Sequence, residues 1–423
     1  MSKSARKINL LQSGIILSVV GFLTQGIHYG FQAIVSPLLG GQKGEFGLVI
    51  TTISFIGFLA LPLTIATQAV THYVARFHIS GEDARLNALL AGCRKFLLHI
   101  TVAGSVLAII LVKPLGHYFE IPRTGLTVIA LVCVLGGLWS AYVVALCQGL
   151  GWFKRMALIG LLAAVLRVVV GLPLTHLWPV AESAVLASVV MLLPNLILFY
   201  WRKDFPKQVA TAESPWNQEF VQFLIVSAAY VIGSYCFSSA DQLVANKFFA
   251  ASYKESLDAY SSAGLLARAL PNTAGPLLVV LFTHRSGRNH KDGLGDQMKL
   301  FGLYALGLIL GAAMLYLLRG FCLQILHRNT PEAAGMVGHL AMTMVFAGLI
   351  QALGTWSLAS RWLKVSLLYG VLGVTYWLTL LTVGLTPPDL LGVMPVALGT
   401  ALAIMLVIWL NTMYRQHPPT PEL

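Results

Sequence analysis

The sequence predicts an all-α protein that crosses a membrane many times. Hydrophobic residues make up 57% of the 423 positions and charged residues only 10%, and the mean hydropathy is +0.77. A soluble domain carries about 25% charged residues, so this chain has too few to cover a soluble surface. Apolar runs of about 20 residues recur along it, which is the length a helix needs to cross about 30 Å of hydrocarbon. In lipid such runs must be helical, because every backbone N–H and C=O needs an internal partner.

The apolar runs divide into twelve predicted spans. Their fifth and sixth members are the hardest to separate, because Pro173 and Pro179 leave little room for a turn between them. The spans are 12–38, 46–75, 96–117, 125–148, 156–178, 179–201, 218–248, 259–283, 297–318, 334–360, 362–384 and 387–413.

The positive charges predict how the chain is oriented. The net charge is +12, but the charges lie in short segments between spans and form no continuous basic face, which argues against a nucleic-acid partner. Most of the 28 Lys and Arg residues fall in the segments that face inward when the N-terminus is inside. Because cytoplasmic loops are enriched in these residues, we expect both termini to be cytoplasmic. The basic start, MSKSARKINL, leads into a first span that stays in the chain rather than into a signal peptide.

The chain also predicts two lobes. A polar segment, DFPKQVATAESPWNQ, lies near its middle, so we expect an N-terminal six-helix lobe at 1–202, a cytoplasmic linker at 203–217 and a C-terminal six-helix lobe at 218–423. The segments FQAIVSPLLGGQKGEFGLVITT and ADQLVANKFFAASYKESLDAYSSAGL occupy matching places in the two halves. Six spans per half preserve the orientation, so we expect parallel repeats with a binding site between the lobes.

Nothing in the sequence indicates an enzyme or a cofactor. The five cysteines lie in or beside the spans without a CxxC pair, so we predict neither a metal site nor a disulfide framework. A membrane-embedded glycan polymerase or ligase is an alternative function, but it would need reactive groups on a large outer loop. The predicted outer loops are short and hold no nucleophile paired with a base.

Three segments carry a family resemblance, namely GQKGEFGLVIT, THYVARFHISGEDARLNALLAGCRKFL, and SSADQLVANKFF with AYSSAGLLARALP. They resemble the Wzx-type oligosaccharide flippases of the multidrug/oligosaccharidyl-lipid/polysaccharide (MOP) exporter superfamily. The resemblance implies a flippase that moves a lipid-linked oligosaccharide across the bacterial inner membrane by alternating access, for polysaccharide or cell-envelope synthesis. It implies a polyprenyl-diphosphate-linked glycan and membrane lipid as binding partners, and glycan polymerase and glycosyltransferases as functional ones. The similar lipid II flippases use arginines in their first two spans. This chain has none between Lys7 and Arg76, which argues against a peptidoglycan precursor.

Two ionised residues lie in adjacent spans of the second half. A charge at the bilayer centre costs about 2.5–3.5 kcal/mol on insertion scales, so each needs a partner. Asp241 lies in span 218–248 and Arg268 in span 259–283. One interpretation is an ion pair that neutralises both, and the other is contact with the substrate or a coupling cation. Both interpretations stay open.

Arg167 is the deepest cation of the first half. It lies in LLAAVLRVVVGLP with no acidic residue in the adjacent membrane sequence. The planar guanidinium offers five donors that suit a lipid diphosphate. We therefore predict an anion contact. The alternative is hydrogen bonding to carbonyl groups of a neighbouring helix.

Uncharged polar side chains recur at helical spacing in several spans. Amides, hydroxyls and imidazoles are suitable partners for sugar hydroxyls, whereas the alternative is hydrogen bonding between helices. The candidate substrate-binding residues of this kind are Gln25, His28, Gln32, Gln68 and Asn272.

The nearest alternative is a cation-coupled multidrug exporter of the same superfamily. Such a carrier needs a carboxylate in its N-terminal lobe, and the first six spans offer only Glu182, close to the outer end of the sixth. This scarcity favours the flippase.

Overall fold

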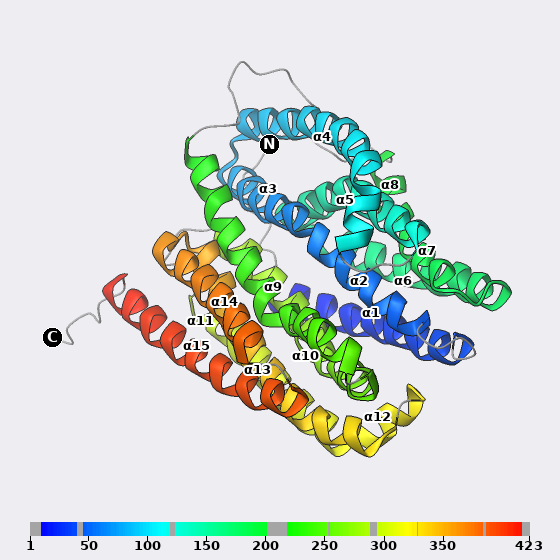
Figure 1. Cartoon of the computed structure of the whole chain (residues 1–423). Coiled ribbons are helices and arrows are strands. Elements are labelled where there is room, and N and C mark those ends of the chain that lie inside the picture. The colour runs from blue at the N-terminus through cyan, green and yellow to red at the C-terminus, as the bar shows by residue number, and fades with distance from the viewer. Residues whose placement is uncertain are drawn as a thin grey trace. The chain divides into compact units, whose positions relative to one another are not determined.

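The computed structural model describes residues 10–39, 45–118, 123–200, 218–252, 254–287, 294–327, 329–383 and 386–416. Every regular element within these ranges is a helix (Figure 1). The helices of the first half are α1 (Leu10–Leu38), α2 (Glu45–Leu59), α3 (Leu61–Ser80), α4 (Asp83–Tyr118), α5 (Thr124–Gly149), α6 (Phe153–Leu177), α7 (Ala181–Val190) and α8 (Leu193–Tyr200). Those of the second half are α9 (Gln218–Ser252), α10 (Lys254–Gly287), α11 (Leu294–Leu317), α12 (Arg319–Ile325), α13 (Pro331–Ala359), α14 (Leu363–Val383) and α15 (Pro387–Gln416).

The helices follow the predicted spans closely. Among the described residues, nine helices are long and apolar enough to cross a bilayer, or ten when the bent pair α2–α3 counts as one. Helix α1 and the pair α7–α8 occupy the first and sixth predicted spans. The uncertain division between the fifth and sixth spans is also resolved, because α6 runs through Pro173 and Pro179 lies in the turn before α7.

Two spans are broken, each just before a proline. Helices α2 and α3 meet at Ala60 with a bend of 47°, and Pro62 follows two residues later. Helices α7 and α8 are separated at residues 191–192, two residues before Pro194. Proline lacks the N–H that would continue the helical ladder, and its ring clashes with the preceding turn. The bend between α2 and α3 is visible in the blue part of Figure 1. By contrast, α10 continues through Pro271 and Pro276 without a break.

The chain forms two compact units. Unit 1 comprises Met1–Val221 and Thr273–Tyr304, and unit 2 comprises Gln222–Asn272 and Ala305–Leu423. The predicted linker, 203–217, lies outside the described residues. The predicted lobe boundaries at 202 and 218 therefore stay a prediction.

Unit 1 has an apolar core near the N-termini of α2, α5 and α7. Its fully buried side chains come from these three helices and from the end of α1, namely Phe31, Val35, Leu39, Val49, Phe55, Leu126, Ala130, Ala181, Ala184, Val185 and Ala187. Farther along α5, two adjacent glycines meet both broken spans. A Cβ on Gly136 would lie 2.7 Å from Leu192, and one on Gly137 would lie 3.3 Å from Leu63. The absence of side chains at this pair lets α5 pass both breaks.

Unit 2 is held together by an aromatic wedge between α9, α13 and α14. A Cβ on Gly233 would lie 2.8 Å from the Tyr369 ring, and one on Gly354 would lie 2.6 Å from it. The Tyr369 hydroxyl shares a 2.8 Å hydrogen bond with Ser234, and its ring stacks on Tyr230 at 5.2 Å. The two glycines therefore let three helices close around one tyrosine.

Candidate functional site

Of the two interpretations of Asp241 and Arg268, the ion pair is present in unit 2. Arg268 Nη2 donates a hydrogen bond to Asp241 Oδ2. The pair joins α9 to α10, which follow each other along the chain. The Asp241 side chain is 1% exposed and that of Arg268 is 18% exposed, so the pair neutralises two charges that would otherwise be unfavourable in the membrane.

Arg268 is also tied to polar groups of α9. Its Nε donates to the Ser238 carbonyl oxygen at 3.1 Å, and its Nη1 donates to Gln242 Oε1 at 3.2 Å. The Gln242 amide is oriented in turn, because its Nε2 donates to Ser261 Oγ at 2.9 Å. The guanidinium folds back over Gly264, where a Cβ would lie 2.9 Å from Nη1. In this conformation the protein itself supplies acceptors to all three nitrogens of Arg268.

Asp241 is less completely satisfied than its partner. The Tyr260 hydroxyl donates to Oδ2 at 2.6 Å. Oδ1 is buried and has no hydrogen-bond partner among the described residues, and the same is true of the Tyr376 hydroxyl. Tyr376 is close enough to interact electrostatically with Asp241. The carboxylate therefore keeps one oxygen that could accept a proton or contact a cation.

Arg167 lies inside unit 1, between α6 and α1. The residue is 6% exposed. Its Nη1 is 3.4 Å from His28 Nδ1, and its Cζ is 4.6 Å from the centre of the Phe31 ring. The Cys133 thiol of α5 also interacts with it electrostatically. Nε is buried and has no hydrogen-bond partner among the described residues. Arg167 thus neither faces lipid nor pairs with a carboxylate or a helix carbonyl in the part of the chain that the structure describes.

The remaining candidate residues are spread over both units. Gln32 is half-buried on α1, one turn beyond His28, and its Oε1 is enclosed without a hydrogen-bond partner among the described residues. Gln25 on α1 and Gln68 on α3 are half-buried, and Asn272 on α10 is exposed. The structure thus brings His28 and Arg167 together, and it places Gln32 on the same stripe of α1 as His28. Among the described contacts, none connects Gln25, Gln68 or Asn272 to His28 or Arg167. A substrate-binding role for these three residues therefore stays a prediction.

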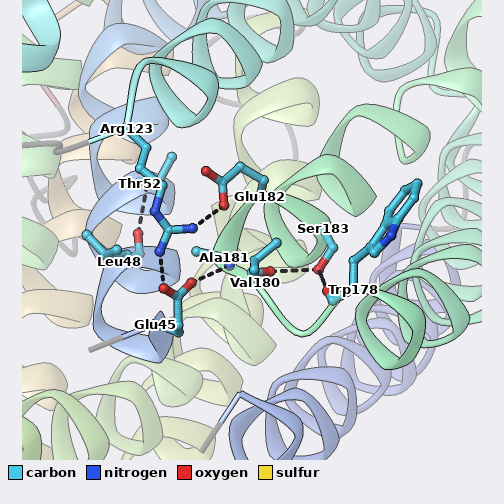
Figure 2. A network of polar contacts seen from close by, with 9 residues as sticks. All are labelled: Glu45, Leu48, Thr52, Arg123, Trp178, Val180, Ala181, Glu182 and Ser183. Atoms are coloured by element: carbon cyan, nitrogen blue, oxygen red, sulfur yellow. Dashed lines mark hydrogen bonds and ion pairs between the residues drawn. The ribbon is translucent and has the colours of Figure 1, made fainter. Parts of the chain in front are cut away.

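Three charged side chains at one end of unit 1 form a network that the sequence analysis did not predict (Figure 2). Arg123, just before α5, donates from Nη2 to Glu45 Oε1 of α2 and from Nη1 to Glu182 Oε2 of α7 at 2.6 Å. Glu45 Oε2 also accepts the backbone N–H of Ala181 at 2.7 Å. The network, which we call the Arg123 clamp (Glu45, Arg123 and Glu182), therefore ties together the N-terminal ends of three helices.

No family model matches the sequence, and a search of curated proteins finds no match. Solved structures do match. A multidrug resistance MATE family transporter of the MOP superfamily in an outward-facing conformation is 11% identical with a TM-score of 0.70, covering 98% of each chain. A MOP superfamily transporter from Pyrococcus furiosus, described as having a binding pocket of reverse polarity, is 13% identical with a TM-score of 0.70, covering 97% of this chain and 98% of that one. A eukaryotic MATE transporter is 12% identical with a TM-score of 0.70, covering 95% and 97%.

The chain has their fold. This all-α, two-lobed fold is the one that these transporters have, as the sequence predicted. In the described part of the chain, no group of three His, Cys, Asp or Glu side chains is placed to hold a metal ion.

The Arg123 clamp corrects one sequence argument. Glu182 was the only acid considered in the first six spans, but Glu45 begins α2 and is 5% exposed. The predicted second span begins at residue 46, one residue after Glu45, so the sequence argument does not include this acid. The predicted topology places the residues before α2, α5 and α7 on one side of the membrane, so opposite charges there are candidates for ion pairs.

Proposed function

We propose that this protein moves an anionic, lipid-linked oligosaccharide across the membrane, with Arg167 binding the phosphate of the carrier. The MOP superfamily fold supports a membrane transporter, and the flippase is the more specific part of the proposal. In this view the protein has no catalytic step. Its ligand is a polyprenyl-diphosphate-linked glycan in a bacterial inner membrane, with both termini in the cytoplasm. Glycosyltransferases would supply the glycan, and a polymerase would consume it.

The surroundings of Arg167 carry the proposal. A buried cation in a membrane needs a counter-charge or acceptors. The described neighbours of Arg167 are an imidazole, a phenyl ring and a thiol, and none of them is negatively charged in this setting. A phosphate group would supply both the missing charge and the missing acceptors. The polarity of the binding pocket bears on function in a similar structure, because the reverse polarity of the pocket in the Pyrococcus furiosus MOP superfamily transporter suggests a different function for that protein.

The other candidate residues have supporting roles in the proposal. His28 contacts Arg167 from α1 and Gln32 lies one turn farther along α1, whereas Gln25, Gln68 and Asn272 would contact sugar hydroxyls as the glycan passes. Arg268 would contact the anion only when its bonds to Asp241, Gln242 and Ser238 loosen, since those acceptors now occupy it.

Reconstitution tests the proposal. The purified protein would be placed in liposomes that contain a fluorescent isoprenyl-diphosphate-linked saccharide, and flipping would be followed by the loss of fluorescence to a membrane-impermeant quencher. We expect flipping with the unsubstituted protein and a loss of about a hundredfold with Arg167→Ala, on the scale of a buried charge-assisted bond. Arg155→Ala is the matched control, because this exposed arginine lies on the same helix. Equal rates for Arg167→Ala and Arg155→Ala would contradict the proposal.

A cation-coupled multidrug exporter is the second candidate, and Asp241 favours it. The free Oδ1 of this buried carboxylate is a group that a proton or sodium ion could occupy. A proton or sodium gradient should then drive efflux of a cationic dye such as ethidium from the same liposomes. Asp241→Asn should abolish that efflux, and Arg167→Ala should not. This pattern is the reverse of the one expected for the flippase.

A further inference from the structure

Two side chains of α1 hold the Arg167 guanidinium from different directions. Nη1 faces His28 Nδ1 at 3.4 Å, and Cζ lies over the Phe31 ring, 4.6 Å from its centre. A guanidinium has only donors, so Nδ1 must be the acceptor, and the imidazole proton must sit on Nε2. Both contacts set the orientation of Arg167 without neutralising its charge.

The Phe31 ring packs against α6 at Gly171, a position without a side chain. A Cβ on Gly171 would lie 2.7 Å from the Phe31 ring and 2.6 Å from Ala187 Cβ. Gly171 and Arg167 are four residues apart and so lie on the same face of α6. Phe31 is 1% exposed. Its ring therefore lies between the guanidinium and a position where α6 carries no side chain.

The contacts leave one edge of the guanidinium unused. Nε is enclosed without an acceptor among the described residues, and no described residue accepts from Nη2. These two N–H groups point the same way on one side of the planar group and match two oxygens on a single atom. Because Nε is enclosed and the whole residue is only 6% exposed, a ligand can reach this edge only in a conformation of the transport cycle that opens it.

We propose that Arg167 binds its ligand side-on, through Nε–H and Nη2–H together, and that Phe31 and His28 are positioning residues for this geometry. The inference rests on the proposed function and specifies its ligand chemistry. The ligand is an oxyanion with two oxygens on one centre, as in a phosphate group, and not merely any anion. A lysine at this position would keep the charge but lose the paired donors.

Calorimetric titration of the full-length protein in nanodiscs tests the geometry. The probes are inorganic pyrophosphate and geranyl diphosphate, which distinguish a free phosphate from a lipid-linked one. We expect Arg167→Lys to weaken binding about tenfold and Phe31→Leu to weaken it about three- to tenfold, through loss of the cation–π contact. Binding of both probes indicates recognition of the phosphate itself, and binding of geranyl diphosphate alone indicates that the lipid is required. Both results support the inference.

Phe55→Leu is the matched control, because Phe55 is 2% exposed in the same apolar cluster as Phe31. It should keep the affinity, with a thermal unfolding midpoint close to that of Phe31→Leu. Equal weakening by Phe55→Leu and Phe31→Leu would show a purely structural role and overturn the positioning role. Wild-type affinity in Arg167→Lys, with Arg167→Ala impaired, would overturn the side-on geometry and leave the proposed function standing. If neither probe binds, or if Arg167→Ala binds as well as the unsubstituted protein, both are overturned.

Discussion

The groups around Asp241 and Arg268 are arranged for one polarity of charge. The Tyr260 hydroxyl donates to position 241, whereas the Ser238 carbonyl and Gln242 Oε1 accept from position 268. A charge swap would place a cation against a hydroxyl donor and a carboxylate against two acceptors. Restoring the Coulomb attraction alone would therefore not restore the site.

We expect Arg268→Ala to destabilise the protein more than the double variant Asp241→Ala/Arg268→Ala does. The single variant leaves the buried Asp241 carboxylate without its cation, and breaking a buried pair in this way is more costly than removing both partners. The difference should be about 1–3 kcal/mol. Thermal unfolding in detergent measures it. A double variant less stable than the single one would show that the two side chains do not depend on each other.

A charge-swapped variant, Asp241→Arg/Arg268→Asp, distinguishes the effect of the ion pair itself from the effect of the polar groups around it. We expect it to be less stable than the double alanine variant, because Tyr260, Ser238 and Gln242 then face groups of the wrong polarity. Thermal unfolding of the two double variants side by side gives the comparison. Recovery of wild-type stability by the swap would mean that the ion pair alone stabilises the hairpin.

The sequence could predict the contact between Asp241 and Arg268, but it could not predict the contact between Arg167 and His28. Asp241 and Arg268 lie on consecutive antiparallel helices. The depth of each residue in the membrane therefore follows from its position within its own predicted span, and the two depths can be compared directly. Arg167 and His28 lie on α6 and α1, which are far apart in the sequence. Periodicity gives the polar face of each helix, but it does not say which distant helix packs against that face. The candidates His28 and Arg167 could be named from the sequence, and their contact could not.

At the scale of helices, a proline is associated with a break in some spans and not in others. Pro62 and Pro194 each lie two residues after a break within their span, whereas α10 continues through Pro271 and Pro276. The sequence could predict where a break is possible, because the missing N–H is local. The outcome also depends on packing, as Gly136 and Gly137 show by making room for Leu192 and Leu63.

The contact of α6 with α1 and α7 gives a prediction about Gly171. Gly171→Ala should destabilise the protein by about 1–3 kcal/mol, because the new methyl group overlaps Ala187 and Phe31. Gly160→Ala on the same helix is the control. A Cβ at Gly160 meets no atom within 4 Å, so this change should be neutral or slightly stabilising. Unfolding midpoints compare the two, and equal effects would contradict the close packing at Gly171.

The Arg123 clamp predicts an asymmetry between its two acids. Glu45→Gln should destabilise unit 1 by about 1–3 kcal/mol, because the buried carboxylate accepts from both Arg123 and the Ala181 N–H. Glu182→Gln should cost less than about 1 kcal/mol, since this side chain is 26% exposed and its pair is partly screened. The exposed pair formed by Glu82 and Arg85 supplies a control, Glu82→Gln. A larger loss for Glu182→Gln than for Glu45→Gln in thermal unfolding would refute the asymmetry.

For the whole molecule, the charge distribution predicts which loops face inward. In a background without cysteine, Lys154→Cys should react with an impermeant maleimide only from the cytoplasmic side, and Lys113→Cys only from the other side. Both side chains are exposed, and each lies close to a helix end, since α4 ends at Tyr118 and α6 begins at Phe153. The reverse pattern would overturn the predicted orientation.

The architecture was more predictable than the sites because hydropathy is a local property. Each span could be recognised from its own residues, and the need to satisfy every backbone group in lipid left the helix as the only choice. The Arg123 clamp was missed for the opposite reason. Glu45 begins α2, Arg123 precedes α5 and Glu182 lies in the first turn of α7, so their contacts depend on how the ends of three helices far apart in the sequence pack together.

The clamp also has a consequence for the order of synthesis. Glu45 leaves the ribosome 78 residues ahead of Arg123 and 136 residues ahead of Ala181. A nascent chain that stops after α4 therefore carries an acid whose neutralising cation has not yet been made. One that stops after α5 has gained the cation but lacks the helix end that Glu45 caps. Since domains are assembled as they emerge, this end of unit 1 can be completed only when the sixth span has been inserted.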